Sequence, residues 1–138
     1  MFSLYLERVY LENAKFKEVY NSKENDYTFI PIFKNWPTYG FHGTSRENAN
    51  KLLKERKPVH IDIAFSQKVA KEYAKLKNDP VILKISIGEL NKKRIYVNYD
   101  VGDDGFTYEG KLPSTIIIME INKWKNIQKT FSCSRWNM

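Results

Sequence analysis

The chain contains one cysteine, Cys133, so it cannot form an internal disulfide, and one cysteine cannot by itself build a zinc site. This scarcity fits a reducing compartment, and we expect a cytoplasmic protein. No apolar run approaches the roughly 20 residues that a membrane-spanning helix needs, so we expect no membrane partner. The first eight residues also lack the basic start and small-residue cleavage site of a secretory signal.

Two common nucleotide fingerprints are missing, because the sequence has neither a G-x-G-x-x-G pattern nor a Walker loop. Internal repeats and low-complexity linkers are missing as well. At 138 residues we expect one domain, acting as a monomer. We divide it into an N-terminal helix and hairpin extension (1–37), a catalytic-like core (38–121) and a C-terminal segment (122–138).

Basic residues are abundant: 23 Lys and Arg stand against 16 Asp and Glu, giving a net charge of +7. The lysines are scattered along the chain. Such a surface attracts phosphates and polyanions, which makes nucleic acid a candidate partner. An AT-rich genome, which enriches lysine, is an equally weighted explanation.

The pattern of apolar residues predicts an α+β fold with a mixed or mainly antiparallel sheet and flanking helices. We expect a helix in the first twenty residues, a turn at 21–26 and β-structure near 27–33. Helices are predicted after Thr44, up to about Arg56, and after Ser66. The remaining predictions are strands at 59–63, 81–87, 95–97, 106–109 and 116–121, and a helix or strand at 123–129.

The most informative stretch runs from Tyr39 to Ser45 and contains Phe41-His42-Gly43-Thr44-Ser45. It predicts a strand that delivers His42 to a turn, with a helix starting directly afterwards. Thr44 and Glu47 have the spacing of a capping box. A histidine beside a glycine can offer its ring and nearby main chain to a nucleotide. The plainer interpretation is a histidine that closes a turn by a local hydrogen bond.

Two further blocks follow in order: Ala64-Phe65-Ser66 before a helix carrying Tyr73, and Tyr108-Glu109-Gly110 before a Pro-containing strand entry. Together the three blocks resemble the histidine–tyrosine–glutamate type of ADP-ribosyltransferase fold, the group of diphtheria toxin and the poly(ADP-ribose) polymerases. The resemblance covers residues 38–121 and implies a split sheet around a cleft. It also implies that NAD is the substrate and that no metal is needed.

By this resemblance His42, Gly43 and Thr44 would hold the NAD, and Tyr73, supported by Phe65, would stack on the nicotinamide. Ser66 would support the ribose or the glutamate, and Glu109 would be the catalytic carboxylate. Phe65 stands where the family usually has a tyrosine. Read singly, Tyr73 is also typical of a core residue and Glu109 of a solvated one.

We considered a metal site at Asp100, Asp103 and Asp104, but the calcium-loop pattern has Lys111 where its closing Glu is required. A solvated acidic loop is the better interpretation there. His60 and Asp62 are interpreted as ordinary strand residues.

The function predicted is transfer of ADP-ribose from NAD to a nucleic acid, a protein or a small molecule, as in toxins, defence factors and drug-modifying enzymes. One alternative is an RNA 2′-phosphotransferase of the same fold. The other is a non-catalytic basic module that docks on nucleic acid or protein.

Overall fold

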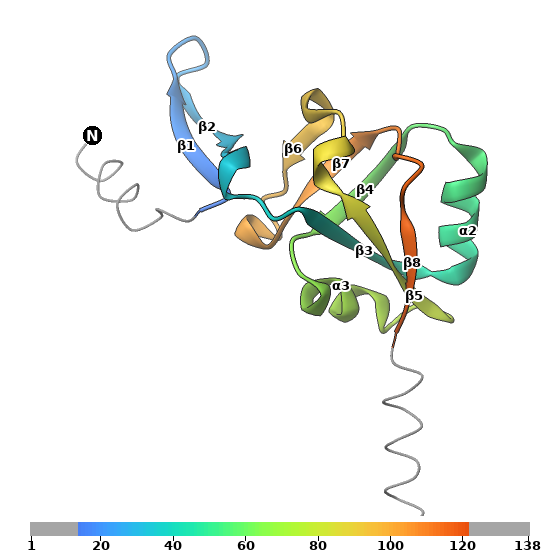
Figure 1. Cartoon of the computed structure of the whole chain (residues 1–138). Helices are drawn as coiled ribbons and strands as arrows, with labels where there is room; N and C mark the ends of the chain where they lie inside the picture. The colour runs from blue at the N-terminus through green and yellow to red at the C-terminus, as the bar shows by residue number, and fades with distance from the viewer. Residues whose placement is uncertain (1–13, 122–138) are drawn as a thin grey trace, which may run out of the picture.

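The computed structural model describes residues 14–121, shown in Figure 1. Within them lie two α-helices, α2 (Arg46–Glu55) and α3 (Gln67–Ala74). The strands are β1 (Phe16–Asn21), β2 (Asp26–Pro31), β3 (Tyr39–Ser45), β4 (Val59–Ala64), β5 (Pro80–Ser86), β6 (Ile95–Val97), β7 (Gly105–Gly110) and β8 (Ile117–Glu120). Among these residues no helix is long and apolar enough to cross a membrane.

Six strands form one sheet in the order β6-β7-β4-β3-β5-β8, and each pairing is antiparallel. The α+β class and the antiparallel sheet are therefore as predicted. Strand β5, which lies between β3 and β8, is apolar on both faces, because Val81, Ile82 and Leu83 are all buried. A strand of this kind needs cover on both sides.

The two helices supply this cover on opposite faces of the sheet. Leu52 and Leu53 of α2 pack on the cluster that contains Val81 and Leu83. Ala70 of α3 packs with Ile82, whose side chain points the other way because side chains alternate along a strand. Figure 1 shows α2 and α3 at different sides of the strands.

β1 and β2 form a separate hairpin. The helix predicted for the first twenty residues is therefore wrong from Phe16 onwards, and residues 1–13 lie outside the described part. Phe16 is buried and its ring packs edge-on against Trp36, at 5.5 Å between centroids. This contact and the pairing with β2 outweigh the weak helical spacing in the sequence. The predicted turn between the strands is confirmed at residues 22–25.

The start of α2 differs from the prediction by one residue. Ser45, rather than Thr44, is the N-cap, and its Oγ accepts a hydrogen bond from the main-chain N–H of Asn48 at 3.1 Å. Thr44 is still part of β3 and is buried. Its hydroxyl oxygen accepts from the side-chain amide of Asn48 at 2.8 Å. The second cap, Ser66 on α3, is as predicted.

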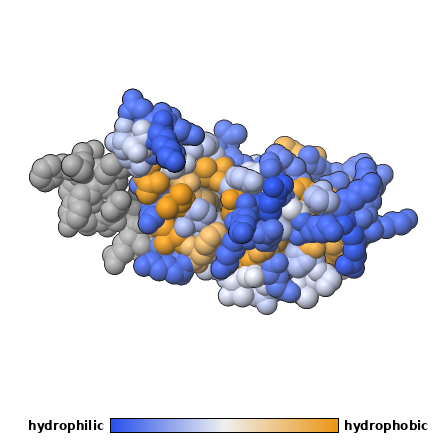
Figure 2. All heavy atoms as spheres, turned by 90° about the horizontal axis from the view of Figure 1, so that it is seen from above, coloured by the Kyte–Doolittle hydropathy of each residue, from blue (hydrophilic) through white to orange (hydrophobic). Residues whose placement is uncertain are grey.

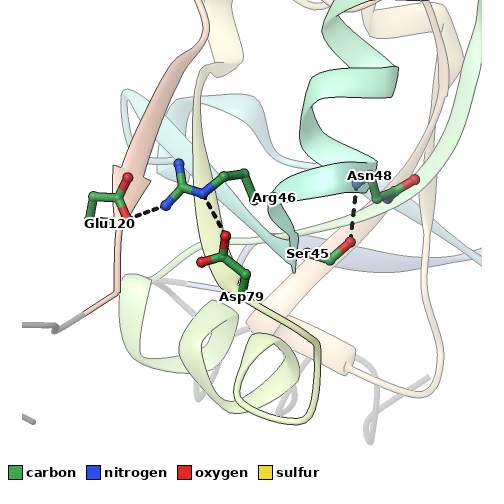
Figure 3. A network of polar contacts seen from close by, with 5 residues as sticks. All are labelled: Ser45, Arg46, Asn48, Asp79 and Glu120. Atoms are coloured by element: carbon green, nitrogen blue, oxygen red, sulfur yellow. Dashed lines mark hydrogen bonds and ion pairs between the residues drawn. The ribbon is translucent and has the colours of Figure 1, made fainter.

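Arg46 ties the start of α2 to two strands, as Figure 3 shows. Its guanidinium donates to Asp79, just before β5, at 2.8 Å, and also to Glu120 at the end of β8. The predicted strand near 116–121 is confirmed as β8. The helix or strand predicted at 123–129, and the segment 122–138 as a whole, lie outside the described residues.

The sheet is interrupted between its two central strands. β3 pairs with β5 over its full length, in seven register pairs from Tyr39 to Ser45. On its other edge, β3 pairs with β4 only through Phe41 and Ala64. Beyond this one pair the two strands separate, so the sheet opens at its centre.

Candidate functional site

A groove of about 560 Å³ lies where β3 and β4 separate. This volume is within the range of small-molecule sites in proteins, roughly 300–1,000 Å³. Strands β3 and β4, helix α3, the loop before β7 and Asn48 of α2 form its walls. Its polar and aromatic lining consists of Phe41, His42, Thr44, Asn48, His60, Asp62, Glu72, Tyr73, Lys77 and Asp104.

Gly43 brings α3 against β3. A Cβ on Gly43 would lie 2.1 Å from the carbonyl oxygen of Ala70 and 2.8 Å from Cβ of Ala74. The absent side chain therefore admits the helix backbone. Gly43 also lines the groove, and the binding role that the resemblance implies for it stays a prediction. Helix α3 covers the face of the sheet toward which a side chain at position 43 would point. Tyr73, which belongs to α3, lies on that same face.

The side chain of Asp62 lies on the same face. Phe41 shares the face of Gly43, since side chains two apart in a strand point the same way. Ala64 is directly opposite Phe41, and Asp62 is two residues before Ala64. Asp62 and, two residues earlier, His60 thus project on the face that α3 partly covers.

His42 bridges the gap between the two strands. Its Nδ1 lies 2.6 Å from the main-chain oxygen of Asp62. A carbonyl oxygen only accepts, so Nδ1 carries the proton and Nε2 is left as an acceptor in the neutral ring. Burial lowers the pKa of His42, and the hydrogen bond to Asp62 offsets part of this effect. The neutral imidazole is therefore favoured. The predicted strand end at His42 is wrong, because β3 continues to Ser45, and the ring binds within the sheet rather than within a turn.

The opened edges of β3 and β4 present main-chain groups to the groove. The oxygen of Asp62 points towards β3. Main-chain groups of alternate residues point to the same side of a strand, so we expect those of His60 to point there too. On β3, Phe41 pairs with β4, so we expect the main-chain groups of Gly43, two residues later, to point towards β4 as well. No strand pairs with these edges beyond the single Phe41–Ala64 pair within residues 14–121.

Of the phenylalanine and tyrosine side chains in the groove lining, that of Tyr73 is the most exposed. Its side chain is on α3 and is 52% exposed. In the described part of the chain its ring makes no contact with another aromatic ring. Leu76, one turn further on, is 86% exposed and also lines the groove. An unoccupied flat ring beside an apolar side chain is suited to stack on a planar ligand.

Two of the predicted binding residues lie outside the groove lining. The ring of Phe65 packs against Trp36 and Phe106, at 4.9 and 5.4 Å between centroids, and so belongs to the core that joins the hairpin to the sheet. The hydroxyl of Ser66 caps α3 by accepting from the N–H of Val69 at 3.3 Å. Both positions have structural roles.

Glu109 is also outside the lining, although it is close to it. It is opposite His60 in the β4–β7 pairing, and its Oε1 is 2.9 Å from Nδ1 of that residue. Glu109 is therefore one strand further from β3 than His60, which does line the groove. The carboxylates that line the groove are those of Asp62, Glu72 and Asp104.

Sequence reasoning assigned no site role to Asp62 or Asp104. The only signal for Asp62 was its position in an alternating strand, two residues before the block Ala64-Phe65-Ser66. That pattern gives the face of the side chain but not the strand next to it. The described residues contain no group of three or more His, Cys, Asp or Glu arranged to hold a metal ion.

Comparison with protein-family models finds no match for this chain. Comparison with curated proteins finds none either.

Proposed function

We propose that the groove binds NAD and that the protein transfers ADP-ribose from it, breaking the bond between nicotinamide and ribose. The observation that carries this is the groove at the split between β3 and β4, which combines His42, an unoccupied aromatic ring at Tyr73 and exposed main-chain edges. The three-block order in the sequence supports the same assignment, since the first two blocks contribute His42 and Tyr73.

Each part of the groove suits one part of NAD. Tyr73 offers a face for the nicotinamide ring. Exposed main-chain N–H and C=O groups match the donor and acceptor of a carboxamide. His42 offers Nε2 to a ribose hydroxyl, because its Nδ1 is already committed to Asp62. Lys77, also in the lining, supplies positive charge for a pyrophosphate.

An RNA 2′-phosphotransferase of the same fold would use the same groove and the same NAD. It needs cationic side chains to hold an additional phosphate. Lys77 is the cation in the groove lining, whereas Asp62, Glu72 and Asp104 are acidic. This balance favours ADP-ribosyl transfer. A purely docking module does not require a groove of this volume, and the basic charge of +7 alone supports it.

The net charge of +7 indicates which kind of ADP-ribose acceptor the protein would attract. In Figure 2 hydrophilic residues cover much of the molecule, and hydrophobic residues gather in patches between them. With 23 Lys and Arg in the chain, an anionic acceptor such as nucleic acid would be attracted over a distance. Transfer to nucleic acid should then fall steeply as salt rises, while hydrolysis of NAD without acceptor should fall little.

The test is release of nicotinamide from labelled NAD, together with the thermal shift that NAD produces. We expect both with the full chain, and neither with Tyr73→Ala at the same NAD concentration. Tyr20→Ala is the matched control, because Tyr20 is 51% exposed but lies in the separate hairpin. Absence of both release and thermal shift in the wild-type protein at high concentration refutes the proposal.

A further inference from the structure

Asp62 is fixed more firmly than the other acidic side chains around the groove. Its carboxylate Oδ1 accepts a hydrogen bond from the hydroxyl of Thr107 at 2.8 Å. Its main-chain oxygen accepts from His42 at 2.6 Å. Thr107 is directly opposite Asp62 in the β4–β7 pairing, so both partners sit on regular strands. The bond from Thr107 fixes the carboxylate and the bond from His42 fixes the main chain of the same residue, so the Asp62 side chain has little freedom left to lose.

The other carboxylates are occupied elsewhere or less constrained. Glu72 pairs with Lys75 on its own helix at 2.6 Å, and this hydrogen bond lowers the pKa of Glu72. Glu109 pairs with His60, outside the lining. Asp104 lines the groove from the loop before β7, where its main-chain oxygen accepts from the N–H of Phe65. No hydrogen bond of the Asp104 side chain is recorded within residues 14–121.

The second oxygen of Asp62 therefore has a defined place in the groove lining, on the face of the sheet that α3 and Tyr73 cover. A preorganised negative charge at such a place stabilises a positive charge that develops during a reaction. We propose that Asp62 is the catalytic carboxylate of the groove, and that Thr107 is the residue that positions it. This assignment rests on the proposed function.

The reaction that Asp62 would assist breaks the bond between C1′ of the ribose and the ring nitrogen of nicotinamide. The bonding electron pair goes to that nitrogen, so nicotinamide leaves neutral and the ribose gains oxocarbenium character. Asp62 would accept a hydrogen bond from a ribose hydroxyl and stabilise that charge. The acceptor then attacks C1′ and loses a proton. With water as acceptor, the products are ADP-ribose, nicotinamide and one proton.

The first experiment compares Asp62→Asn with Glu109→Gln and Asp103→Asn. Asn keeps an oxygen that accepts from Thr107 but removes the charge. We expect Asp62→Asn to lower nicotinamide release by about 10²-fold with its NAD-induced thermal shift retained. Asp103→Asn is the neutral control, since Asp103 is exposed and outside the lining. Near wild-type turnover in Asp62→Asn, or a 10²-fold loss in Glu109→Gln alone, overturns the assignment.

The second experiment tests Thr107 and does not depend on the folding of the Asp62 variant. Thr107→Val keeps the shape but removes the donor, so kcat should fall several-fold while KM for NAD stays the same. Thr107→Ser should restore kcat, because the hydroxyl returns. Equal kcat values in the Val and Ser variants contradict the positioning role. Failure of the wild-type protein to bind or cleave NAD refutes the proposed function itself, which separates the two outcomes.

Discussion

The two edges of β3 are built in opposite ways. Towards β5 the strand pairs through all seven of its residues, and Val81, Leu83 and Ile85 of β5 belong to the core. Towards β4 it pairs through Phe41 alone and then leaves a groove. The same seven residues, Tyr39–Ser45, thus support the fold on one edge and supply His42 and exposed main chain on the other.

This contrast explains how a small domain keeps a gap in the middle of its sheet. Unpaired main-chain groups are costly when they are buried away from water. Here the side chain of His42 satisfies the oxygen of Asp62, and the groove leaves the other groups accessible. We call the β5 side of β3 the closed edge and its β4 side the open edge. The hydrogen bonds of the closed edge compensate for those that the open edge lacks. Substitutions on the two edges should therefore separate stability from binding.

Leu83→Ala, on the closed edge, should have the largest effect on stability. Leu83 is fully buried in β5, opposite His42 in register. Removing its side chain leaves a cavity and should lower the free energy of unfolding by about 2–5 kcal/mol. Denaturation with urea measures this. Tyr73→Ala, on the groove side, should change the same quantity by less than about 0.5 kcal/mol, as exposed positions usually do. Comparable losses in the two variants would contradict the division of roles.

Gly43→Ala should come next, because it forces α3 away from β3. The added methyl would overlap the main chain of Ala70, which is not a flexible neighbour. We expect a loss of about 1–3 kcal/mol in the free energy of unfolding, together with weaker NAD binding. Gly88→Ala is the matched control, since a Cβ there meets no atom within 4 Å. The prediction fails if the two alanine variants are equally stable.

Ser45→Ala tests the last residue of β3, which is also the N-cap of α2. It removes the cap of α2 and should lower the free energy of unfolding by about 1 kcal/mol. Thr44 does not cap the helix, so it cannot replace the lost hydroxyl. Ser114→Ala serves as a comparison, because Ser114 is exposed in a turn. Thermal denaturation of the two variants should show a lower Tm only for the first.

The smallest expected effect is a pH dependence carried by His42. Its pKa is lowered in the folded protein, so below about pH 6.5 the unfolded chain binds more protons than the folded one. Stability should therefore be lost as the pH falls from 6.5 towards the folded-state pKa, and should change no further below it. Protonation also removes Nε2 as an acceptor, so NAD binding should weaken over the same range. His42→Gln should flatten this part of both profiles, and an unchanged slope would contradict it.

Most helices and strands of the sheet could be predicted from local patterns in the sequence. Apolar alternation gave β4, the cap at Ser66 gave α3, and the continuous apolar run gave β5. The error at β1 has a clear cause, because Phe16 is buried by Trp36, twenty residues away in the chain. Contacts of this kind decide between helix and strand but leave no local pattern.

The site was less predictable than the fold for the same reason. The sequence predicts Tyr73 on a helix, which is confirmed, and His42 at a strand end, whereas His42 lies in the middle of β3; both line the groove. The sequence pattern predicts an ordinary strand residue at Asp62, because the hydrogen bond that holds its carboxylate comes from Thr107 in β7, 45 residues later. The catalytic role predicted for Glu109 stays a prediction, since its place beside His60 follows from strand register and not from its own neighbours in sequence.

The open edge between β3 and β4 also affects how this protein can change over generations. Recognition by main-chain groups survives most substitutions, because every residue except proline carries the same N–H and C=O. Leu76 at the rim of the groove is 86% exposed, so this position can vary with little loss of folding. Under the proposed function, a lineage could change its acceptor by altering the rim, while the main-chain groups that would bind NAD stay the same.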